Sequence, residues 1–165
     1  MGYREKYYSF IEKLKKEIID FYGDRLVSLV IFGSVASDRF RPDSDIDILL
    51  IVKDLPCGRM KRLEEFVANI ENKFDNEIRE FMKENISITL SPLFKTPEEV
   101  QTGSPLFLDM TENCKILFDR EKFFTEHLQN LKEKLNKLGA KKIYKKGGYY
   151  WLLKPDYKHG DIIEL

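Results

Sequence analysis

The sequence predicts a mixed α/β (α+β) protein in which helices flank a mixed β-sheet, with a C-terminal helix and an aromatic, basic tail. Three observations support this class. Short apolar strands alternate with amphipathic helices along the chain. The length of 165 residues suits one compact domain. A hydrophobic content of 42% can fill a core and argues against wholesale disorder. We expect the helices to cover one face of the sheet.

The first half of the chain supplies a helix, two strands and a second helix. Apolar residues in 4–22 recur at steps of three and four, as on one face of a helix, and Gly23 is a natural stop for it. Residues 26–32 form a continuous apolar run, which is typical of a buried strand, and residues 46–52 form a second. The apolar spacing that follows predicts one long amphipathic helix over residues 60–81.

The second half continues the alternation. The pattern Ile-Ser-Ile-Thr-Leu predicts a half-buried strand over residues 86–90. Residues 96–99, Thr-Pro-Glu-Glu, have the capping box and early proline of a helix start, and Ser104 with the next proline starts another short helix. We expect a strand over residues 115–118 and a last helix over residues 124–138.

Composition excludes several classes of protein. The 28 Lys plus Arg residues balance 28 Asp plus Glu, which argues against coating nucleic acid by bulk attraction. Lysine and glutamate dominate the charged set, a weak sign of a thermophilic source. Cys57 and Cys114 lie outside any metal-ligand spacing, so we interpret them as reduced cysteines. With no signal-peptide core and no apolar run that could span a bilayer, we expect a cytoplasmic protein without membrane contact.

The tail over residues 141–165 leaves two interpretations open. Its lysines and aromatic residues include Lys141, Lys142, Lys145, Lys146, Tyr149, Tyr150 and Trp151. They have the character of a surface that stacks on and neutralises a nucleic acid strand. The alternative is a hairpin or extended arm whose aromatic residues pack on the core or on a second subunit of a homo-oligomer. The balanced charge and the lack of an RNA-binding motif favour the alternative.

The stretch with most chemical information begins at Gly33-Ser34, directly after the first predicted strand. Glycine lets the backbone approach a ligand closely, and the amides that follow it can point at a phosphate. The Ser34 hydroxyl adds another donor. By itself a Gly-Ser pair is equally a structural turn, so its meaning depends on what lies near it.

Asp45 and Asp47 give that context. They are two residues apart at the start of the second predicted strand, so both carboxylates project from one face. Side-by-side carboxylates repel each other, and a divalent cation relieves the repulsion. Mg²⁺ prefers such oxygen ligands, with phosphate oxygens completing its shell. The short link from Ser34 makes turn and acidic pair neighbours. The combination predicts metal-assisted phosphoryl-type transfer, with Asp45 and Asp47 as catalytic and metal-binding residues.

Two further positions complete the set of candidates. Ser44 precedes the acidic pair and joins Gly33 and Ser34 as a nucleotide-binding candidate, although Ser44 and Asp43 also suit a loop and strand cap. Glu98 and Glu99 look like charges at a helix start.

The whole stretch resembles the signature of the DNA polymerase β-like nucleotidyltransferase superfamily, in particular the small minimal nucleotidyltransferases of archaea and bacteria. That signature is Gly-Ser, ten residues, then Asp-x-Asp, often with Arg-Pro-Asp-Ser before the acidic pair. Residues 33–34, 41–44 and 45–47 match it in register. The resemblance implies a nucleotidyltransferase domain over residues 1–118, with a C-terminal helix and extended tail over residues 119–165 packed on it. It also implies ATP or another nucleoside triphosphate as substrate, Mg²⁺ or Mn²⁺ as metal, and transfer onto a hydroxyl.

The chain departs from the family pattern in two places. Ser37 and Asp38 stand where the family often has Arg and Gly, which removes a cation and adds a carboxylate near the turn. Aspartate tolerates unusual backbone angles, so the turn can survive. Active members also carry a third carboxylate on a later strand. The strand predicted over residues 86–90 offers only Ser87 and Thr89 on its polar face, so we expect one of these hydroxyls to stand in the place of the acid.

Three functional hypotheses follow. The first is an enzyme that transfers a nucleoside monophosphate from a nucleoside triphosphate. The second is a nucleotide-binding module with little or no turnover, which the absent third carboxylate favours. The third rests on the resemblance alone: small nucleotidyltransferases of this kind act as antitoxin partners of a helical HEPN toxin.

Overall fold

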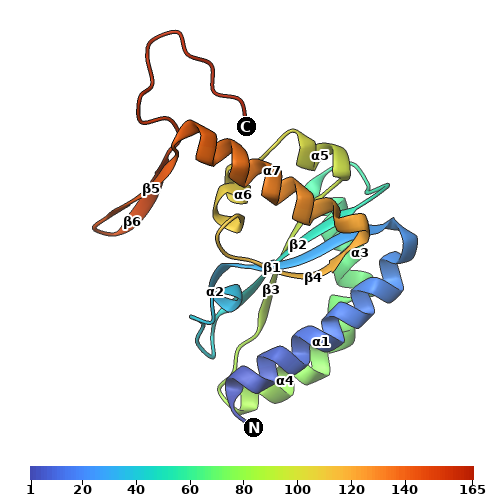
Figure 1. Cartoon of the computed structure of the whole chain (residues 1–165). Helices are drawn as coiled ribbons and strands as arrows, with labels where there is room; N and C mark the ends of the chain where they lie inside the picture. The colour runs from blue at the N-terminus through green and yellow to red at the C-terminus, as the bar shows by residue number, and fades with distance from the viewer.

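A computed structural model describes all residues 1–165. A four-stranded mixed sheet, in the order β3-β2-β1-β4, lies at the centre, and a two-stranded hairpin projects beyond it (Figure 1). The six strands are β1 Leu26–Phe32, β2 Asp45–Val52, β3 Thr89–Lys95, β4 Lys115–Asp119, β5 Lys141–Lys145 and β6 Gly148–Leu152. The helices are α1 Tyr3–Tyr22, α2 Gly33–Ala36, α3 Arg59–Asn69, α4 Asp75–Lys83, α5 Pro97–Gln101, α6 Pro105–Met110 and α7 Phe123–Leu138. Short 3-10 turns span Gly23–Arg25, Glu71–Phe74 and Arg120–Lys122.

The sheet pairs β1 antiparallel with both β2 and β4, and β2 parallel with β3. The expectation that the first two strands are neighbours in one sheet is confirmed. Their register places Phe32, the last residue of β1, opposite Asp47 near the start of β2. The turn that follows β1 and the acidic pair therefore lie at the same end of the sheet.

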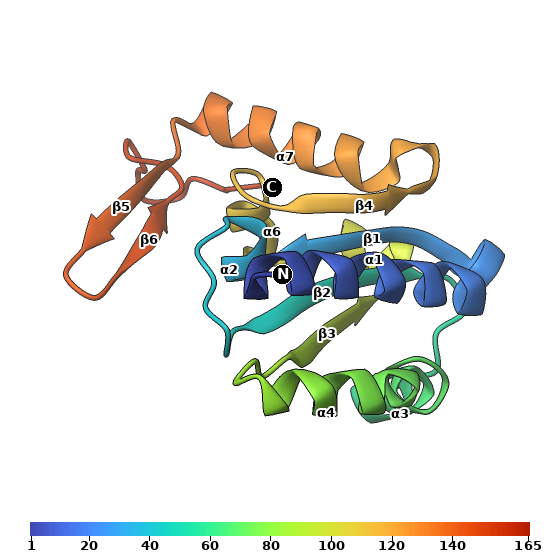
Figure 2. The same ribbon diagram turned by 90° about the horizontal axis from the view of Figure 1, so that it is seen from below.

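Helices cover both faces of the sheet, so the expectation of a single covered face is wrong. One core cluster packs α1, α3 and α4 against alternate residues of the central strands, such as Leu29 and Ile48. The other packs α5, α6 and α7 against the residues between them, such as Val30 and Leu49. Figure 2 shows α1 over one face of the sheet and α6 behind it. Continuous apolar runs in β1 and β2 are the signature of strands buried on both sides.

Two predicted elements differ from the structure. The single helix over residues 60–81 is broken, because Ile70 adopts φ −126° and ψ −65° and a 3-10 turn follows before α4 begins. Ile70 and Phe74 both stay buried across the break. The third strand begins at Thr89 rather than at residue 86. The Ser87 amide donates to the Pro42 carbonyl at 2.8 Å outside the sheet, while Ile86 and Ile88 are buried without ladder pairing.

The C-terminal part begins with α7, which packs on the sheet and ends at Gly139 with φ +70°, as its sequence predicts. The β5–β6 hairpin follows and forms its own small sheet. It stands out from the body of the molecule beyond the end of α7 (Figures 1 and 2). Among these helices, none combines the length and apolar character that crossing a membrane requires.

Candidate active site

The candidate site begins at the turn between β1 and α2, where Gly33 lies directly against Asp47. The Gly33 backbone has φ +69°, a left-handed conformation that favours glycine. A Cβ at this position would come within 2.2 Å of Asp47 Oδ2 and 3.2 Å of Asp47 Cγ. Both the backbone angle and the missing side chain are therefore needed for the turn to approach the carboxylate.

The turn is fixed by its own hydrogen bonds. The Ser37 hydroxyl donates to the carbonyls of Gly33 (3.3 Å) and Ser34 (3.1 Å). The Arg39 amide donates to the Ser34 carbonyl at 3.0 Å. The first amides of a helical turn have no acceptor within it. Ser34 and its neighbours therefore present backbone donors close to the acidic pair.

Asp38, one of the departures from the family signature, is accommodated as expected. Its φ of +57° is in the left-handed region. Its carboxylate accepts a hydrogen bond from the Tyr8 hydroxyl and pairs with Lys115 Nζ at 3.0 Å. The Tyr8 hydrogen bond and the adjacent Lys115 ammonium lower the pKa of this carboxyl. The extra charge near the turn is thus balanced by neighbouring side chains.

The acidic pair lies at the start of β2, on one face of the strand. Asp45 is exposed, whereas Asp47 is partly buried. In the parallel pairing with β3, Asp45 is opposite Thr89 and Asp47 is opposite Ser91. Burial raises the pKa of Asp47, the Asp45 charge adds to the rise, and a hydrogen bond with Ser91 opposes it. The fold therefore disfavours the ionised form of Asp47, and within the chain only the neutral Ser91 hydroxyl stabilises that form.

No third acid joins the pair from β3. Ser87 precedes the strand, so of the two predicted hydroxyls only Thr89 lies beside the acidic pair. Sequence reasoning missed Ser91, the residue next to Asp47. No group of three or more His, Cys, Asp or Glu side chains gathers to form a metal site anywhere in the chain. The two carboxylates still suit a hard divalent cation whose remaining ligands are phosphate oxygens and water.

The other sequence candidates take part in local structure. The Ser44 hydroxyl accepts a hydrogen bond from the Arg41 amide at 2.9 Å, and its carbonyl accepts one from the Tyr7 hydroxyl at 2.8 Å. Asp43 pairs with Arg41 at 3.3 Å in the exposed loop. Glu99 completes the expected capping box with Thr96 and also binds Arg62 through two hydrogen bonds of 2.8 and 2.9 Å.

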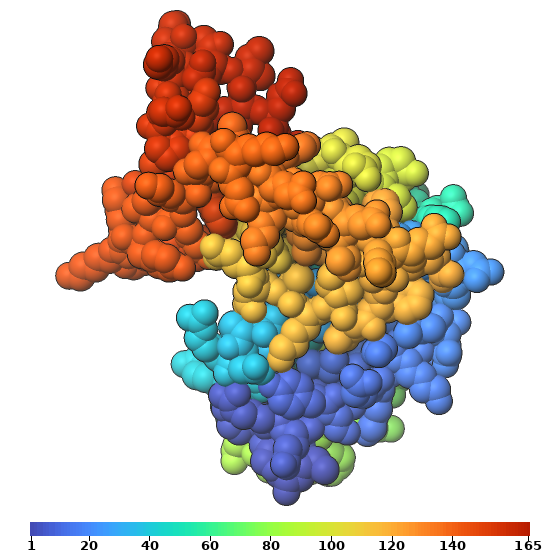
Figure 3. Space-filling view, in the orientation of Figure 1, coloured from blue at the N-terminus to red at the C-terminus, as the bar shows by residue number.

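A pocket of about 770 Å³ opens beside Gly33 and Asp47. Its lining comes from the turn after β1, from α6 and from the hairpin, and Figure 3 shows α6 between the other two. Of the nucleotide and metal candidates, only Gly33 and Asp47 line it, and they are joined there by Arg39 and by Lys142, Tyr144 and Tyr149 of the tail. The lysines and aromatic residues of the tail were visible in the sequence, but nothing local indicated which part of the molecule they face.

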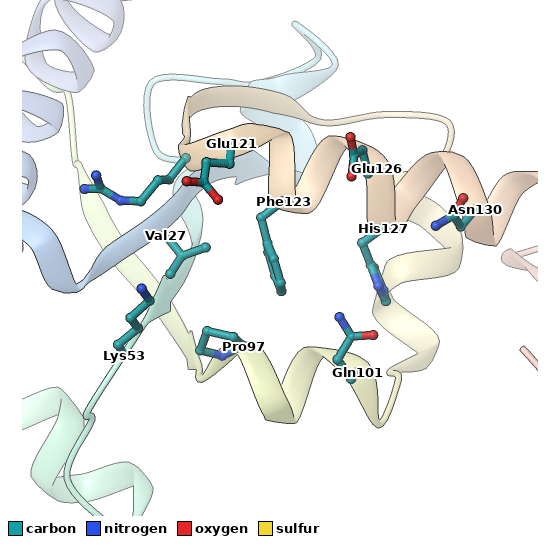
Figure 4. Close-up of a pocket in the computed structure, with 10 residues that line it drawn as sticks. Val27, Lys53, Pro97, Gln101, Glu121, Phe123, Glu126, His127 and Asn130 are labelled. Carbon is teal, nitrogen blue, oxygen red and sulfur yellow. The ribbon is translucent and has the colours of Figure 1, made fainter.

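A second pocket, of about 420 Å³, lies near the opposite end of the sheet, between α5 and α7 (Figure 4). Phe123 and His127 project from α7 toward Pro97 and Gln101 of α5. Burial lowers the pKa of His127, and the Lys134 charge contributes. The His127 ring stacks on that of Phe124, with 6.0 Å between centroids, and is partly buried at the edge of the core. None of the candidate site residues lines this pocket.

Comparison with known sequences gives three matches. The family model described as "Nucleotidyltransferase domain" matches residues 11–142. A protein of Methanocaldococcus jannaschii named "Putative protein adenylyltransferase MJ1305" is 29% identical over 128 residues, which is 74% of this chain and 76% of that protein. Another from the same organism, "Putative protein adenylyltransferase MJ0141", is 35% identical over 66 residues, 39% of this chain and 67% of that protein.

Two solved structures superpose on the chain. Spectinomycin adenyltransferase AAD(9) from Enterococcus faecialis, in complex with ATP and spectinomycin, superposes with a TM-score of 0.50 at 13% identity. The match covers 78% of this chain and 66% of that one. A toxin–antitoxin structure with AMP-PNP superposes with a TM-score of 0.44 at 16% identity, covering 78% of this chain and 92% of that chain. At such low identity the first of these likenesses establishes the architecture alone.

Proposed function

We propose that this chain, which belongs to the nucleotidyltransferase domain family, transfers a nucleoside monophosphate from a nucleoside triphosphate to a hydroxyl acceptor. The observation that carries the proposal is the contact between the Gly33 turn and the Asp47 carboxylate, which leaves no room for a Cβ. A phosphate held by the turn would lie beside the acidic pair. That juxtaposition is what metal-assisted phosphoryl chemistry requires.

Each residue has a distinct role in the proposed reaction. The backbone amides of the turn and the Ser34 hydroxyl bind the β- and γ-phosphates. The exposed guanidinium of Arg39 adds a positive charge at the same pocket. Asp45 and Asp47 would hold Mg²⁺ or Mn²⁺, and such an ion supplies polarisation of the phosphate oxygens. These contacts orient the α-phosphorus toward the open pocket.

The transfer is a single displacement. The acceptor oxygen forms a bond to the α-phosphorus, the bond from that phosphorus to the bridging oxygen of the β-phosphate breaks, and pyrophosphate leaves with its electron pair. The acceptor hydroxyl gives its proton to solvent water as the new bond forms. We take ATP as the nucleotide because the two relatives from M. jannaschii are named as protein adenylyltransferases. The same names make a hydroxyl-bearing protein side chain the proposed acceptor.

A second candidate is a nucleotide-binding module with slow turnover. The observation that favours it is the neutral Ser91 hydroxyl beside Asp47, on the strand where the family resemblance implies an acid. In that case a partner would donate the missing acid, or the protein would act by binding alone. A HEPN-type partner is the form of this candidate that the family resemblance suggests, and co-purification of the chain with the product of a neighbouring HEPN gene tests it.

The experiment for the proposal combines binding with transfer. Thermal unfolding is recorded with and without MgATP for the wild type and for Asp45→Asn with Asp47→Asn, and the same proteins are incubated with α-labelled ATP and cell lysate. MgATP should raise the wild-type melting temperature, because a ligand of the native state stabilises it. The double variant should lose the metal-dependent part of that rise and any labelled product.

Asp43→Asn is the matched control, because this exposed carboxylate lies in the loop before β2, two residues from Asp45. It should retain the full shift. An unchanged metal dependence in the double variant would contradict the proposed site. Binding without labelled product in the wild type would favour the second candidate.

A further inference from the structure

The pocket beside Gly33 and Asp47 has one side that the two acids and the phosphate turn do not explain. Its volume of about 770 Å³ is in the range of small-molecule and cofactor sites. The turn and β2 supply one side, and Lys142, Tyr144 and Tyr149 of the hairpin supply another. Any ligand that fills the pocket from the turn outward must contact this hairpin surface.

The hairpin presents a defined set of side chains there, which we call the aromatic face. Cross-strand pairing places Lys142 opposite Trp151 and Tyr144 opposite Tyr149. Opposed residues of an antiparallel pair, and residues two apart on a strand, share one face. The aromatic face therefore consists of Lys142, Tyr144, Tyr149 and Trp151, and the first three of these line the pocket. Tyr150 belongs to the other face, where its ring lies 5.1 Å from Lys145 Nζ.

Asp109 of α6 fixes the aromatic face in position. Its carboxylate accepts hydrogen bonds from the Tyr149 hydroxyl at 2.7 Å and from Trp151 Nε1 at 3.0 Å, and it pairs with Lys142 Nζ at 3.3 Å. Burial alone would raise the pKa of Asp109, but these hydrogen bonds outweigh it and the pKa is lowered. An isolated two-stranded hairpin is marginally stable in water, so this carboxylate and the packing of Trp151 on the core together hold the hairpin against α6.

The same contacts pair the only hairpin cation that lines the pocket. Lys142 Nζ lies between Asp109 and Glu112, 3.2 Å from the latter, and 3.9 Å from the centre of the Tyr149 ring. Lys142 is thus already satisfied by two carboxylates and an aromatic ring. Tyr144 is different, because its side chain is 73% exposed and its ring lies 6.0 Å from that of Tyr149. It is the free aromatic surface of the pocket.

We propose that the aromatic face is the base-binding wall of the nucleotide pocket, with the nucleobase stacked on Tyr144 while the phosphates reach the Gly33 turn and Arg39. The inference rests on the proposed function, since it extends the same site. It assigns the hairpin a role in nucleotide affinity rather than in binding a nucleic acid strand. Every nucleobase has a π-face, and stacking on one aromatic ring contributes enough to be measured by alanine substitution.

The test separates the base from the phosphates. Isothermal titration of the full chain measures the Kd of MgATP and of magnesium tripolyphosphate, which lacks a base. We expect Tyr144→Ala to weaken MgATP roughly tenfold and leave tripolyphosphate unchanged. Tyr144→Phe keeps the ring and should bind both ligands as the wild type does. Tyr150→Ala, on the opposite face of the same hairpin, is the matched control and should also match the wild type.

The outcomes distinguish this inference from the proposed function. An MgATP affinity that Tyr144→Ala leaves unchanged would overturn the base-binding wall, and so would equal weakening of both ligands. Equal losses from Tyr144→Ala and Tyr150→Ala would instead indicate a general role of the hairpin and would also overturn it. If the wild type binds neither ligand, the proposed function fails at the phosphate site, and the wall fails with it. Circular dichroism establishes that each variant folds.

Discussion

Aspartates at the two ends of the central sheet differ in how the fold treats their charge. At the end of β4, Asp119 accepts hydrogen bonds from the Ser28 hydroxyl (2.7 Å), the Phe124 amide (2.9 Å) and both the amide and hydroxyl of Thr125 (2.9 and 2.6 Å). At the start of β2, Asp47 has one neutral hydroxyl neighbour and a like charge nearby.

The difference shows how a structural acid and a ligand-binding acid can be told apart. The Asp119 carboxylate has a structural role, because its hydrogen bonds connect β4 to β1 and to the start of α7. Burial raises the pKa of Asp119, but the hydrogen bonds outweigh it and the pKa is lowered. The charge of Asp47 has no comparable partner within the chain, and its pKa is raised. A partly buried carboxylate that has only one neutral hydroxyl as a partner remains available to bind a ligand that the chain does not itself provide.

The largest expected effect is on stability, and it tests the structural role of Asp119. Asp119→Ala leaves four donors without their acceptor and removes the cap of α7, so we expect a loss of about 3 kcal/mol in the free energy of unfolding. Urea unfolding at neutral pH measures it. Asp47→Asn is the control at the other end of the sheet and should lose nothing, because it removes a disfavoured charge. Equal losses of unfolding free energy in the two variants would show that the two aspartates do not differ in their contribution to stability.

The next effect concerns the approach of the turn to the acid. Gly33→Ala places a Cβ against Asp47 Oδ2 in a left-handed backbone conformation, so the turn must shift. Strain of this size predicts MgATP binding weakened by about tenfold or more, measured by titration calorimetry. Gly2→Ala is the control, since no atom lies within 4 Å of its added Cβ. If Gly33→Ala binds MgATP as tightly as the wild type, the contact has no role in the site.

A smaller effect appears in the pH dependence of stability. The folded-state pKa of Asp119 is below its unfolded value, so its stabilisation is present above the unfolded pKa of about 3.9 and is lost as pH falls through the folded pKa. Asp119→Asn should therefore lose less stability than the wild type between pH 7 and pH 3, in urea unfolding across that range. Asp47→Asn should show no such reduction, because the pKa of Asp47 is shifted upward. If Asp119→Asn loses as much unfolding free energy between pH 7 and pH 3 as the wild type, Asp119 is not the source of this pH dependence.

The smallest effect concerns the hydroxyl in place of the third acid. Ser91→Asp puts a carboxylate opposite Asp47 in the β2–β3 register, and we expect Mg²⁺ affinity to rise by roughly fivefold, or about 1 kcal/mol. Without metal the same variant should be less stable, because like charges then face each other. Ser87→Asp, which precedes the strand, should change neither property. A higher affinity in both variants would indicate a general charge effect.

The elements that local sequence determines were predicted well. The apolar run of β1, the capping box at Thr96 and the glycine that ends α7 each depend on neighbours in the chain, and the structure has all three. The alternation that predicts a strand over residues 86–90 ends at Leu90, whereas β3 runs from Thr89 through Pro92 to Lys95. The strand tolerates this proline because β3 lies at the edge of the sheet, where one side has no ladder to complete.

What the sequence left open depends on contacts between distant segments. The Gly-Ser and Asp-x-Asp pattern predicted that turn and acids are neighbours, and Gly33 does lie against Asp47. Their roles as ligands of nucleotide and metal remain predictions. The hairpin residues beside them were not foreseeable, because Lys142 and Tyr149 reach the pocket only through Asp109, more than thirty positions earlier in the chain. Local patterns carry no information on such pairings.

The arrangement of β1 and β2 also has a consequence for how the molecule forms. Residues 33–44 alone connect these two central strands, so their antiparallel pairing closes a short loop at a small cost in chain entropy. Contacts close in sequence form early and quickly. The Gly33 turn and both β2 acids therefore lie in the first third of the chain, which the ribosome makes before the hairpin. Synthesis builds the acidic end of the sheet first and adds the aromatic side of its pocket last.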